Sequence, residues 1–263
     1  GRRTQAHVAL HRDGTFCLVR SVAPAAERAA FAAEAARPNG LRVGAPAARL
    51  IESDAGLHAV LPLVSGCTLP QLLQANEERP LPLDVSLSIG VGIADQLGRL
   101  HDTGDLMPHH VLVGWDGVVH LLDPAGDMAS QRSQLASRAT YRSPEHVRSE
   151  PLSPRSDVFG LGLLLFEMTT GREAFVSEGA ALEADIVRGR IPRPREIAGD
   201  GYPIELQLIS RKLLRPTPSG RFQDATAARE ALRLVASGRS QVGADALAAW
   251  VKEKLQKDNA TWL

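Results

Sequence analysis

The chain has 263 residues, 44% of them hydrophobic, and its 30 basic and 30 acidic side chains give a formal net charge of zero. This length suffices for one large domain, or for two lobes that share a sizeable core. The balanced charge gives no bulk electrostatic reason to bind nucleic acid or an anionic membrane. Cys17 and Cys67 form neither a disulfide framework nor a metal-ligand spacing, so we expect two buried, reduced thiols.

The longest uncharged apolar stretch, residues 158–166, is too short to span a bilayer. No apolar core of an export signal follows Gly1-Arg2-Arg3. We therefore expect a cytoplasmic location without direct membrane insertion, either for the chain alone or as the cytosolic part of a longer, anchored protein.

The first third of the chain alternates predicted strands with one helix. Residues 7–11 and 15–22 predict two strands, and residues 24–36 predict an alanine-rich helix. Residues 48–52 and 57–64 predict a second hairpin.

The pattern then becomes mostly helical. Residues 69–75 and 83–101 predict helices, the second with a wide apolar face. Residues 111–113 and 118–122 predict short strands around the turn Trp115-Asp116-Gly117, and helices and loops follow Ser143. The expected fold class is α+β, with two lobes. A small β-rich N-lobe covers residues 1–66 and a larger helical C-lobe covers 67–236. Residues 237–263 form a linker and an amphipathic helix that packs on the C-lobe or docks a partner.

Four motifs in the second half carry a family resemblance. They are Tyr141-Arg-Ser-Pro-Glu145, Ser156-Asp-Val-Phe-Gly-Leu-Gly162, Phe166-Glu-Met-Thr-Thr-Gly-Arg-Glu-Ala-Phe175 and Leu213-Leu-Arg-Pro-Thr-Pro-Ser-Gly-Arg-Phe222. Together they resemble bacterial, eukaryotic-like serine/threonine protein kinases, and the resemblance covers residues 6–236. It implies a two-lobed protein-kinase-like fold.

The resemblance also implies structural roles for particular residues. Glu145 and Arg221 would form a buried ion pair, and removing either partner would strand a buried charge. Asp157 would accept backbone N–H bonds from the loop that carries Asp105. Gly160 and Gly162 lie in an apolar predicted helix, where close packing against neighbouring backbone would explain them.

The parts that handle phosphate depart from the family. Phosphoryl transfer needs clamped phosphates, a held metal ion and an oriented acceptor hydroxyl. The first forty residues contain only Gly1, Gly14 and Gly40, so the first strand and the glycine-rich loop are absent or degenerate. Arg20 stands where the family has its phosphate-clamping lysine, and the first lysine of the chain is Lys212.

Glu34 matches the glutamate that pairs with that lysine in the family. It would pair with Arg20 here, unless both are solvated surface charges. In the catalytic loop, which lacks the His-Arg pair, Asp105 aligns with the catalytic aspartate, Met107 with the assisting lysine, and His110 with the metal-binding asparagine.

Histidine favours softer metals than Mg²⁺. We interpret His109 and His110 as loop or partly buried histidines, with a zinc site as the alternative. Asp123-Pro124-Ala125 replaces Asp-Phe-Gly, which keeps the carboxylate but stiffens the loop. Arg138 replaces the hydroxyl that normally meets the catalytic aspartate.

These departures favour a pseudokinase without a cofactor, which serves as a scaffold or allosteric regulator in bacterial signalling. The expected partners are an active serine/threonine kinase, a phosphopeptide-binding domain or another complex component, and not nucleic acid. Ser133, Ser137 and Thr140 lie near arginines and are possible phosphosites, although an ordinary solvated loop would look the same. The alternative function is a nucleotide-binding domain or an atypical phosphotransferase with a rearranged site around Asp123 and Asp105.

Overall fold

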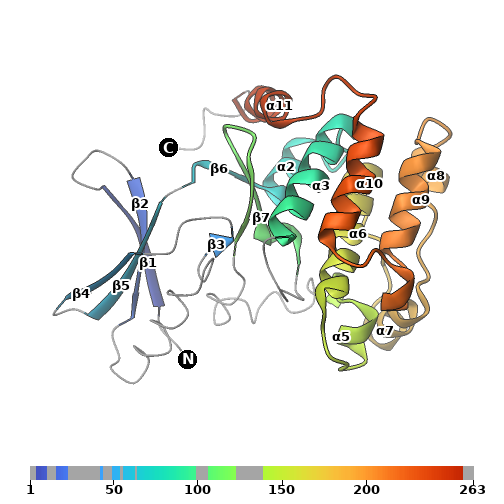
Figure 1. Cartoon of the computed structure of the whole chain (residues 1–263), viewed down its shortest axis with the longest axis horizontal. Coiled ribbons are helices and arrows are strands. Elements are labelled where there is room, and N and C mark those ends of the chain that lie inside the picture. Colours follow the sequence, from blue (N-terminus) through green and yellow to red (C-terminus); the bar gives the residue numbers. More distant parts are fainter. Residues whose placement is uncertain are drawn as a thin grey trace. The chain divides into compact units, whose positions relative to one another are not determined.

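The computed structural model describes residues 4–10, 16–22, 42–43, 49–53, 56–62, 64–98, 106–122 and 139–256, which fall into two units (Figure 1). The first unit contains the described residues up to Ser65, together with Leu121 and Leu122. The second contains the described residues of 66–120 and 139–256. Antiparallel strands dominate the first and helices the second, which is the predicted α+β architecture.

A four-stranded antiparallel sheet forms the first unit, in the order β1-β2-β5-β4. Its strands are β1 (Thr4–Leu10), β2 (Phe16–Val22), β4 (Arg49–Ser53) and β5 (Gly56–Pro62). The imidazole of His58 on β5 links three strands. Its Nδ1 lies 2.7 Å from Ser21 Oγ on β2, and its Nε2 lies 2.7 Å from Ser53 Oγ on β4. Both predicted hairpins are therefore present, whereas the predicted helix at residues 24–36 lies outside the described residues.

Short strands complete the sheet structure. In the first unit, β3 (Arg42–Val43) pairs antiparallel with Leu122 and Leu121 of β8 (Val119–Leu122). In the second unit, β6 (Gly66–Thr68) pairs antiparallel with β7 (Val111–Gly114), with Cys67 opposite Val113. The turn before β8 follows the prediction, since Asp116 Oδ1 accepts the Val118 N–H at 3.0 Å and Gly117 has a φ of 76°.

Helices make up most of the second unit. They are α2 (Leu69–Ala75), α3 (Leu83–Leu97), α5 (Pro144–Val147), α6 (Pro154–Thr170), α7 (Gly179–Arg188), α8 (Pro194–Ala198), α9 (Ile204–Leu213), α10 (Ala225–Ala236) and α11 (Ala244–Gln256), with 3₁₀ turns η1 (Pro108–His110) and η4 (Pro218–Gly220). Local chemistry explains several ends. Asp224 caps α10 by accepting the Ala227 N–H at 2.8 Å, and Gly171 ends α6 at a φ of 68°.

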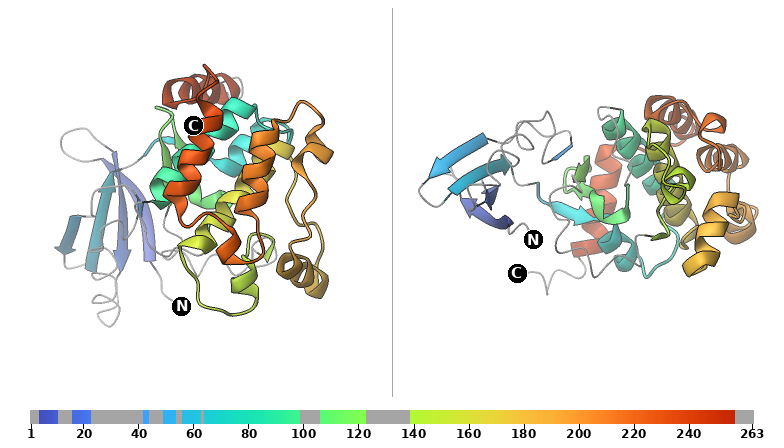
Figure 2. Two further views of the ribbon diagram at one scale, coloured as in Figure 1. Left: turned by 45° about the vertical axis from the view of Figure 1, so that its right-hand side comes forward. Right: turned by 90° about the horizontal axis from the view of Figure 1, so that it is seen from below.

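Helix α6 is the centre of this unit's core. Fourteen of its 17 residues are buried, and it packs against α3, α8, α9 and α10. Helices α3 and α10 lie side by side (Figure 2). Although α6 is strongly apolar, none of the described helices has both the length and the apolar character needed to cross a bilayer.

Gly160 and Gly162 allow neighbouring side chains to approach α6. A Cβ at position 160 would lie 2.9 Å from Leu106 Cβ, and one at position 162 would lie 2.8 Å from Leu213 Cβ. The expectation of close packing was right. The expected backbone neighbour is present at Gly160, where the Leu106 carbonyl oxygen lies 3.5 Å from that Cβ position, whereas Gly162 meets leucine side-chain atoms instead.

Helix α11 packs on the second unit, as the first of its two predicted roles required. It contacts α2 and α3, and Leu247 and Val251 on its inner face are buried. Its first residue touches the β7–β8 turn so closely that a Cβ on Gly117 would lie 1.9 Å from the Ala244 carbonyl oxygen. The positive φ and this close approach together require glycine at position 117.

Candidate functional site

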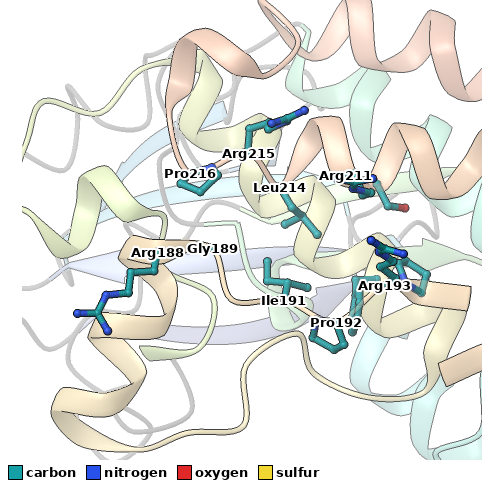
Figure 3. Close-up of a pocket in the computed structure, with 12 residues that line it drawn as sticks. Arg188, Gly189, Ile191, Pro192, Arg193, Arg211, Leu214, Arg215 and Pro216 are labelled. Atoms are coloured by element: carbon teal, nitrogen blue, oxygen red, sulfur yellow. The ribbon is translucent and has the colours of Figure 1, made fainter. Parts of the chain in front are cut away.

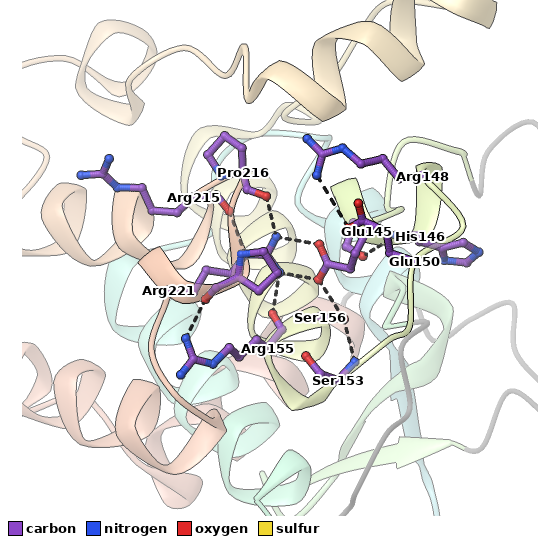
Figure 4. A network of polar contacts seen from close by, with 12 residues as sticks. Glu145, His146, Arg148, Glu150, Ser153, Arg155, Ser156, Arg215, Pro216 and Arg221 are labelled. Carbon is purple, nitrogen blue, oxygen red and sulfur yellow. Dashed lines mark hydrogen bonds and ion pairs between the residues drawn. The ribbon is translucent and has the colours of Figure 1, made fainter.

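The Arg221 guanidinium is the centre of a polar network in the second unit (Figure 4). It forms a bidentate pair with Glu145, at 2.6 Å to Oε1 and 2.8 Å to Oε2. The remaining three N–H groups donate to the carbonyl oxygens of Arg155, Arg215 and Pro216 at 2.7, 2.7 and 3.2 Å. All five guanidinium donors are therefore satisfied, which is the condition under which a buried cation is tolerated.

Glu145 is equally enclosed, with the residue 2% exposed. Besides Arg221, its Oε1 accepts the Ser156 hydroxyl at 2.7 Å, and Ser156 Oγ in turn accepts the Ser153 N–H at the start of α6. Burial raises the pKa of Glu145, but the hydrogen bonds from Arg221 and Ser156 outweigh it and hold the pKa below its usual value. The structure thus contains the ion pair that the family resemblance implies, and Glu145 is ionised in it.

This network joins three segments that are distant in sequence. Glu145 lies in the first turn of α5, Ser156 lies in the first turn of α6, and Arg221 follows η4. The Arg221 guanidinium also lies 4.7 Å from the centre of the Phe159 ring, a cation–π contact with the core. The network of Arg221, Glu145 and Ser156 has a structural role, because these polar groups bind other parts of the fold.

The segment that the family resemblance aligns with the catalytic loop continues through η1 to the start of β7. Met107, which the resemblance aligns with the assisting lysine, is 4% exposed, and His110, which it aligns with the metal-binding asparagine, is 6% exposed. His109 between them is exposed. A buried thioether carries no charge, so Met107 cannot balance the charge of a transferred phosphoryl group.

Within the described parts of the chain, no three His, Cys, Asp or Glu side chains gather in a way that would hold a metal ion. His110 is a buried histidine, and it does not belong to a metal-binding group of side chains within the described residues. The carboxylates at positions 105 and 123 lie outside the described residues, so this finding does not concern them.

Several predicted positions fall outside the described residues: Glu34, Asp105, Asp123, Ser133, Ser137 and Arg138, with the side chain of Arg20. The backbone of Arg20 lies in β2, opposite Ala6 and Ala59. Asp157 is 4% exposed in the first turn of α6. Residues 99–105, in the loop whose backbone N–H groups were expected to meet it, lie outside the described residues. Thr140 is half-buried just before α5.

A second, half-buried carboxylate was not singled out from the sequence. The Tyr141 hydroxyl donates to Glu167 Oε2 at 2.7 Å, linking the segment before α5 to α6. Burial raises the pKa of Glu167 to about 7, against the opposing effect of the Tyr141 hydrogen bond, and the nearby Glu173 adds repulsion. The motif at Phe166-Glu167 contained this residue, but nothing in sequence spacing showed that it faces Tyr141.

Cys67 on β6 fits the prediction of a buried thiol. It is 3% exposed, and its Sγ–H points to the Val113 carbonyl oxygen at 3.8 Å. Burial raises the pKa of Cys67 to about 12, so the thiol stays protonated and unreactive at neutral pH. The side chain of Cys17 lies outside the described residues.

Comparison with known proteins returns serine/threonine protein kinases. The chain is 30% identical over 186 residues to serine/threonine-protein kinase PknL of Mycobacterium tuberculosis, covering 64% of this chain and 44% of that protein. It is 26% identical over 193 residues to serine/threonine-protein kinase PknB of Mycobacterium leprae, covering 69% and 31%. It is 30% identical over 181 residues to probable serine/threonine-protein kinase CPE1738 of Clostridium perfringens, covering 64% and 26%.

The aligned region thus spans less than half the length of these curated relatives. No protein-family model matches the chain.

Proposed function

Because the chain belongs to the eukaryotic-like serine/threonine protein kinase family of bacteria, we propose that it is a kinase-like domain that transfers no phosphate and acts by binding other signalling proteins. The observation that carries this proposal is Met107. This uncharged side chain is 4% exposed, and the family resemblance aligns it with the lysine that assists phosphoryl transfer. The neighbouring metal-ligand position holds His110, 6% exposed.

The proposal follows from the charge that the reaction develops. Phosphoryl transfer is catalysed almost entirely by positioned cations and dipoles around the transferred group. Here Met107 removes one cation, Arg20 replaces a compact ammonium by a broad planar fork, and no lysine precedes Lys212. Residues 1–40 contain only Gly1, Gly14 and Gly40, too few for the Gly-x-Gly-x-x-Gly loop that covers phosphates in the family.

The scaffold supports the binding half of the proposal. Every donor of the Arg221 guanidinium is occupied, and α6 is almost entirely buried in the core of the second unit. A chain with an intact core can bind partners through its surface without catalysing the reaction. The partners we propose are an active serine/threonine kinase, a phosphopeptide-binding domain or another component of a cytoplasmic signalling complex, with Thr140, Ser133 and Ser137 as acceptors for a partner kinase.

A thermal shift measurement with nucleotide tests the loss of the phosphate site. A ligand that binds only the folded state at a hundredfold excess over its Kd stabilises that state by about 2.7 kcal/mol. We expect ATP with Mg²⁺ or Mn²⁺ to leave the melting temperature of this chain unchanged. An active homologous kinase, tested in parallel with the same solutions, should shift upward by several degrees.

A saturable upward shift of this chain would instead favour the alternative function, a nucleotide-binding domain with a rearranged site. Adenosine would locate the source of such a shift. If adenosine shifts the melting temperature as far as ATP does, the base is held and the phosphates are not. A shift with ATP alone would contradict the proposed loss of phosphate contacts.

A further inference from the structure

A pocket with a cavity volume of ≈ 310 Å³ opens on the second unit, between the segment that follows α7 and the end of α9 (Figure 3). Four arginines line it: Arg188, Arg193, Arg211 and Arg215. Arg188 is the last residue of α7, Arg193 precedes α8, Arg211 lies in α9 and Arg215 follows α9. All four side chains are exposed. The centre of the pocket is apolar, formed by residues such as Ile191 and Leu214.

Most of the arginines that line this pocket lack a carboxylate at ion-pair distance, although the charge of Arg188 is felt by Asp185. Among the described residues, no carboxylate lies within 4.0 Å of Arg188, Arg211 or Arg215, and Arg193 has only an exposed contact with Glu196 at 3.8 Å. By contrast, two arginines in the same stretch that do not line the pocket are matched at 3.2 Å, Arg190 by Asp185 and Arg195 by Asp200.

Because the carboxylates pair mainly with arginines outside the pocket, net positive charge is concentrated at the rim of the pocket. Like charges gathered at one site repel each other, and a bound anion relieves that repulsion. Guanidinium groups suit carboxylate and phosphate because their planar forks can donate two parallel hydrogen bonds to either group.

The arrangement fits a chain better than a single small anion. In Figure 3, Arg188 lies on one side of Ile191 and Leu214, with its guanidinium directed outward, and Arg193 and Arg211 lie on the other side. One phosphate ion would meet one side only, whereas an extended segment can place an apolar side chain on the centre and negative groups toward both sides.

Helix α9 extends the same surface. Ile204 is 45% exposed and Leu208 is 57% exposed. Residues four and seven positions apart lie on the same face of an α-helix, so these two apolar side chains share a face with Arg211. An apolar stripe that leads into a cationic pocket is complementary to an acidic segment that carries apolar residues.

We propose that this arginine pocket binds an acidic peptide segment of a partner protein, with an apolar side chain over Ile191 and Leu214 and negative groups on the four arginines. The negative groups are carboxylates or phosphates, which present the same chemistry to a guanidinium. The inference goes beyond the proposed function and is independent of it, because the pocket lies away from Met107 and His110 in the sequence and uses none of the phosphate-transfer positions.

The test uses fluorescent peptides and anisotropy. One peptide has a leucine flanked by glutamates, a second replaces the glutamates by glutamine, and a third replaces one by phosphothreonine. The protein is compared with Arg193→Gln/Arg211→Gln and with the control Arg79→Gln/Arg233→Gln. The control removes two exposed arginines that do not line the pocket and lie 2.7 Å from Glu77 and 3.7 Å from Glu230.

We expect the glutamate peptide to bind the unaltered protein and the control equally, and the pocket variant about tenfold more weakly or worse. The glutamine peptide should bind weakly to all three, and added salt should weaken the glutamate complex. Stronger binding of the phosphothreonine peptide would identify phosphate as the preferred anion, and stronger binding of the glutamate peptide would identify carboxylates; either supports the proposal.

Three results would overturn the inference. One is equal affinity of the pocket variant and the control for the glutamate peptide. Another is binding of the glutamine peptide as tight as that of the glutamate peptide. The third is that inorganic phosphate binds as tightly as the peptides. Phosphate-transfer activity would refute the proposed function and leave this pocket standing, so the two proposals fail separately.

Discussion

The variant Arg221→Met is expected to lower the free energy of unfolding of the second unit by about 3–5 kcal/mol, because it strands the buried carboxylate of Glu145. In the native protein that carboxylate is 2% exposed and accepts two hydrogen bonds from Arg221. The substitution also leaves the carbonyl oxygens of Arg155 and Arg215 without these donors. Urea unfolding followed by circular dichroism measures the change.

Two further variants separate the stranded charge from the loss of contacts. Arg233→Met removes an exposed arginine that lies 3.7 Å from Glu230, and it should cost about 1 kcal/mol or less. The double variant Glu145→Met/Arg221→Met removes the stranded charge as well, so it should be more stable than Arg221→Met alone. A single variant as stable as Arg233→Met would contradict the architectural role of the pair.

The second large effect is a pH dependence that Glu167 confers. Burial raises the pKa of Glu167 to about 7 in the folded protein, against an ordinary value of 4.5 for a solvated glutamate. The folded state therefore binds this proton more tightly than the unfolded state, so the contribution to stability is full below about pH 4.5 and falls as the pH rises through about 7. Ionisation of Glu167 should lower the free energy of unfolding by about 2–3 kcal/mol as the pH rises from about 5 to about 8.

Glu167→Gln should remove this dependence, because glutamine carries no titrating proton yet keeps an oxygen that can accept the Tyr141 hydroxyl. Its stability relative to the unaltered protein should therefore rise from about pH 5 to about pH 8. A control, Glu196→Gln, removes a glutamate whose side chain is 58% exposed and should leave the pH profile unchanged. Identical slopes for the unaltered protein and Glu167→Gln would show that the carboxylate does not titrate in this range.

Local chemistry made part of the fold predictable. Thr68 and Pro70 mark the start of α2, whose bounds match the prediction. Asp116 and Gly117 identify the β7–β8 turn, because a side-chain acceptor and a positive φ are local requirements. The motif around Glu145 and Arg221 predicted a contact between residues 76 positions apart, but only through the resemblance to kinases.

Features that depend on tertiary packing were not predictable in the same way. Tyr141 and Glu167 meet only because α6 is buried beside the segment before α5. The neighbours of Gly162 were expected to be backbone and are leucine side chains, whereas Gly160 meets both the side chain and the carbonyl oxygen of Leu106. The arginine pocket was not predictable, because sequence spacing does not show which arginines lie beside carboxylates. The high density of arginine between positions 188 and 195 is the one signal in the sequence that points to it.

The candidate phosphate site was assigned almost entirely from the sequence. Met107 and His110 are placed by the structure, and both are buried. Glu34, Asp105, Asp123 and Arg138 lie outside the described residues, and so does the side chain of Arg20. Their roles therefore remain predictions that rest on the matched motifs.

The most direct measurement of the central claim is transfer of radiolabelled phosphate from ATP, with Mg²⁺ or Mn²⁺, to the protein itself and to a basic protein substrate. The account predicts no label on either, under conditions in which an active homologous kinase labels both. The variant Asp123→Asn identifies any contaminating kinase, whose label would persist in it. Label that appears with the unaltered protein and disappears with Asp123→Asn would contradict the account.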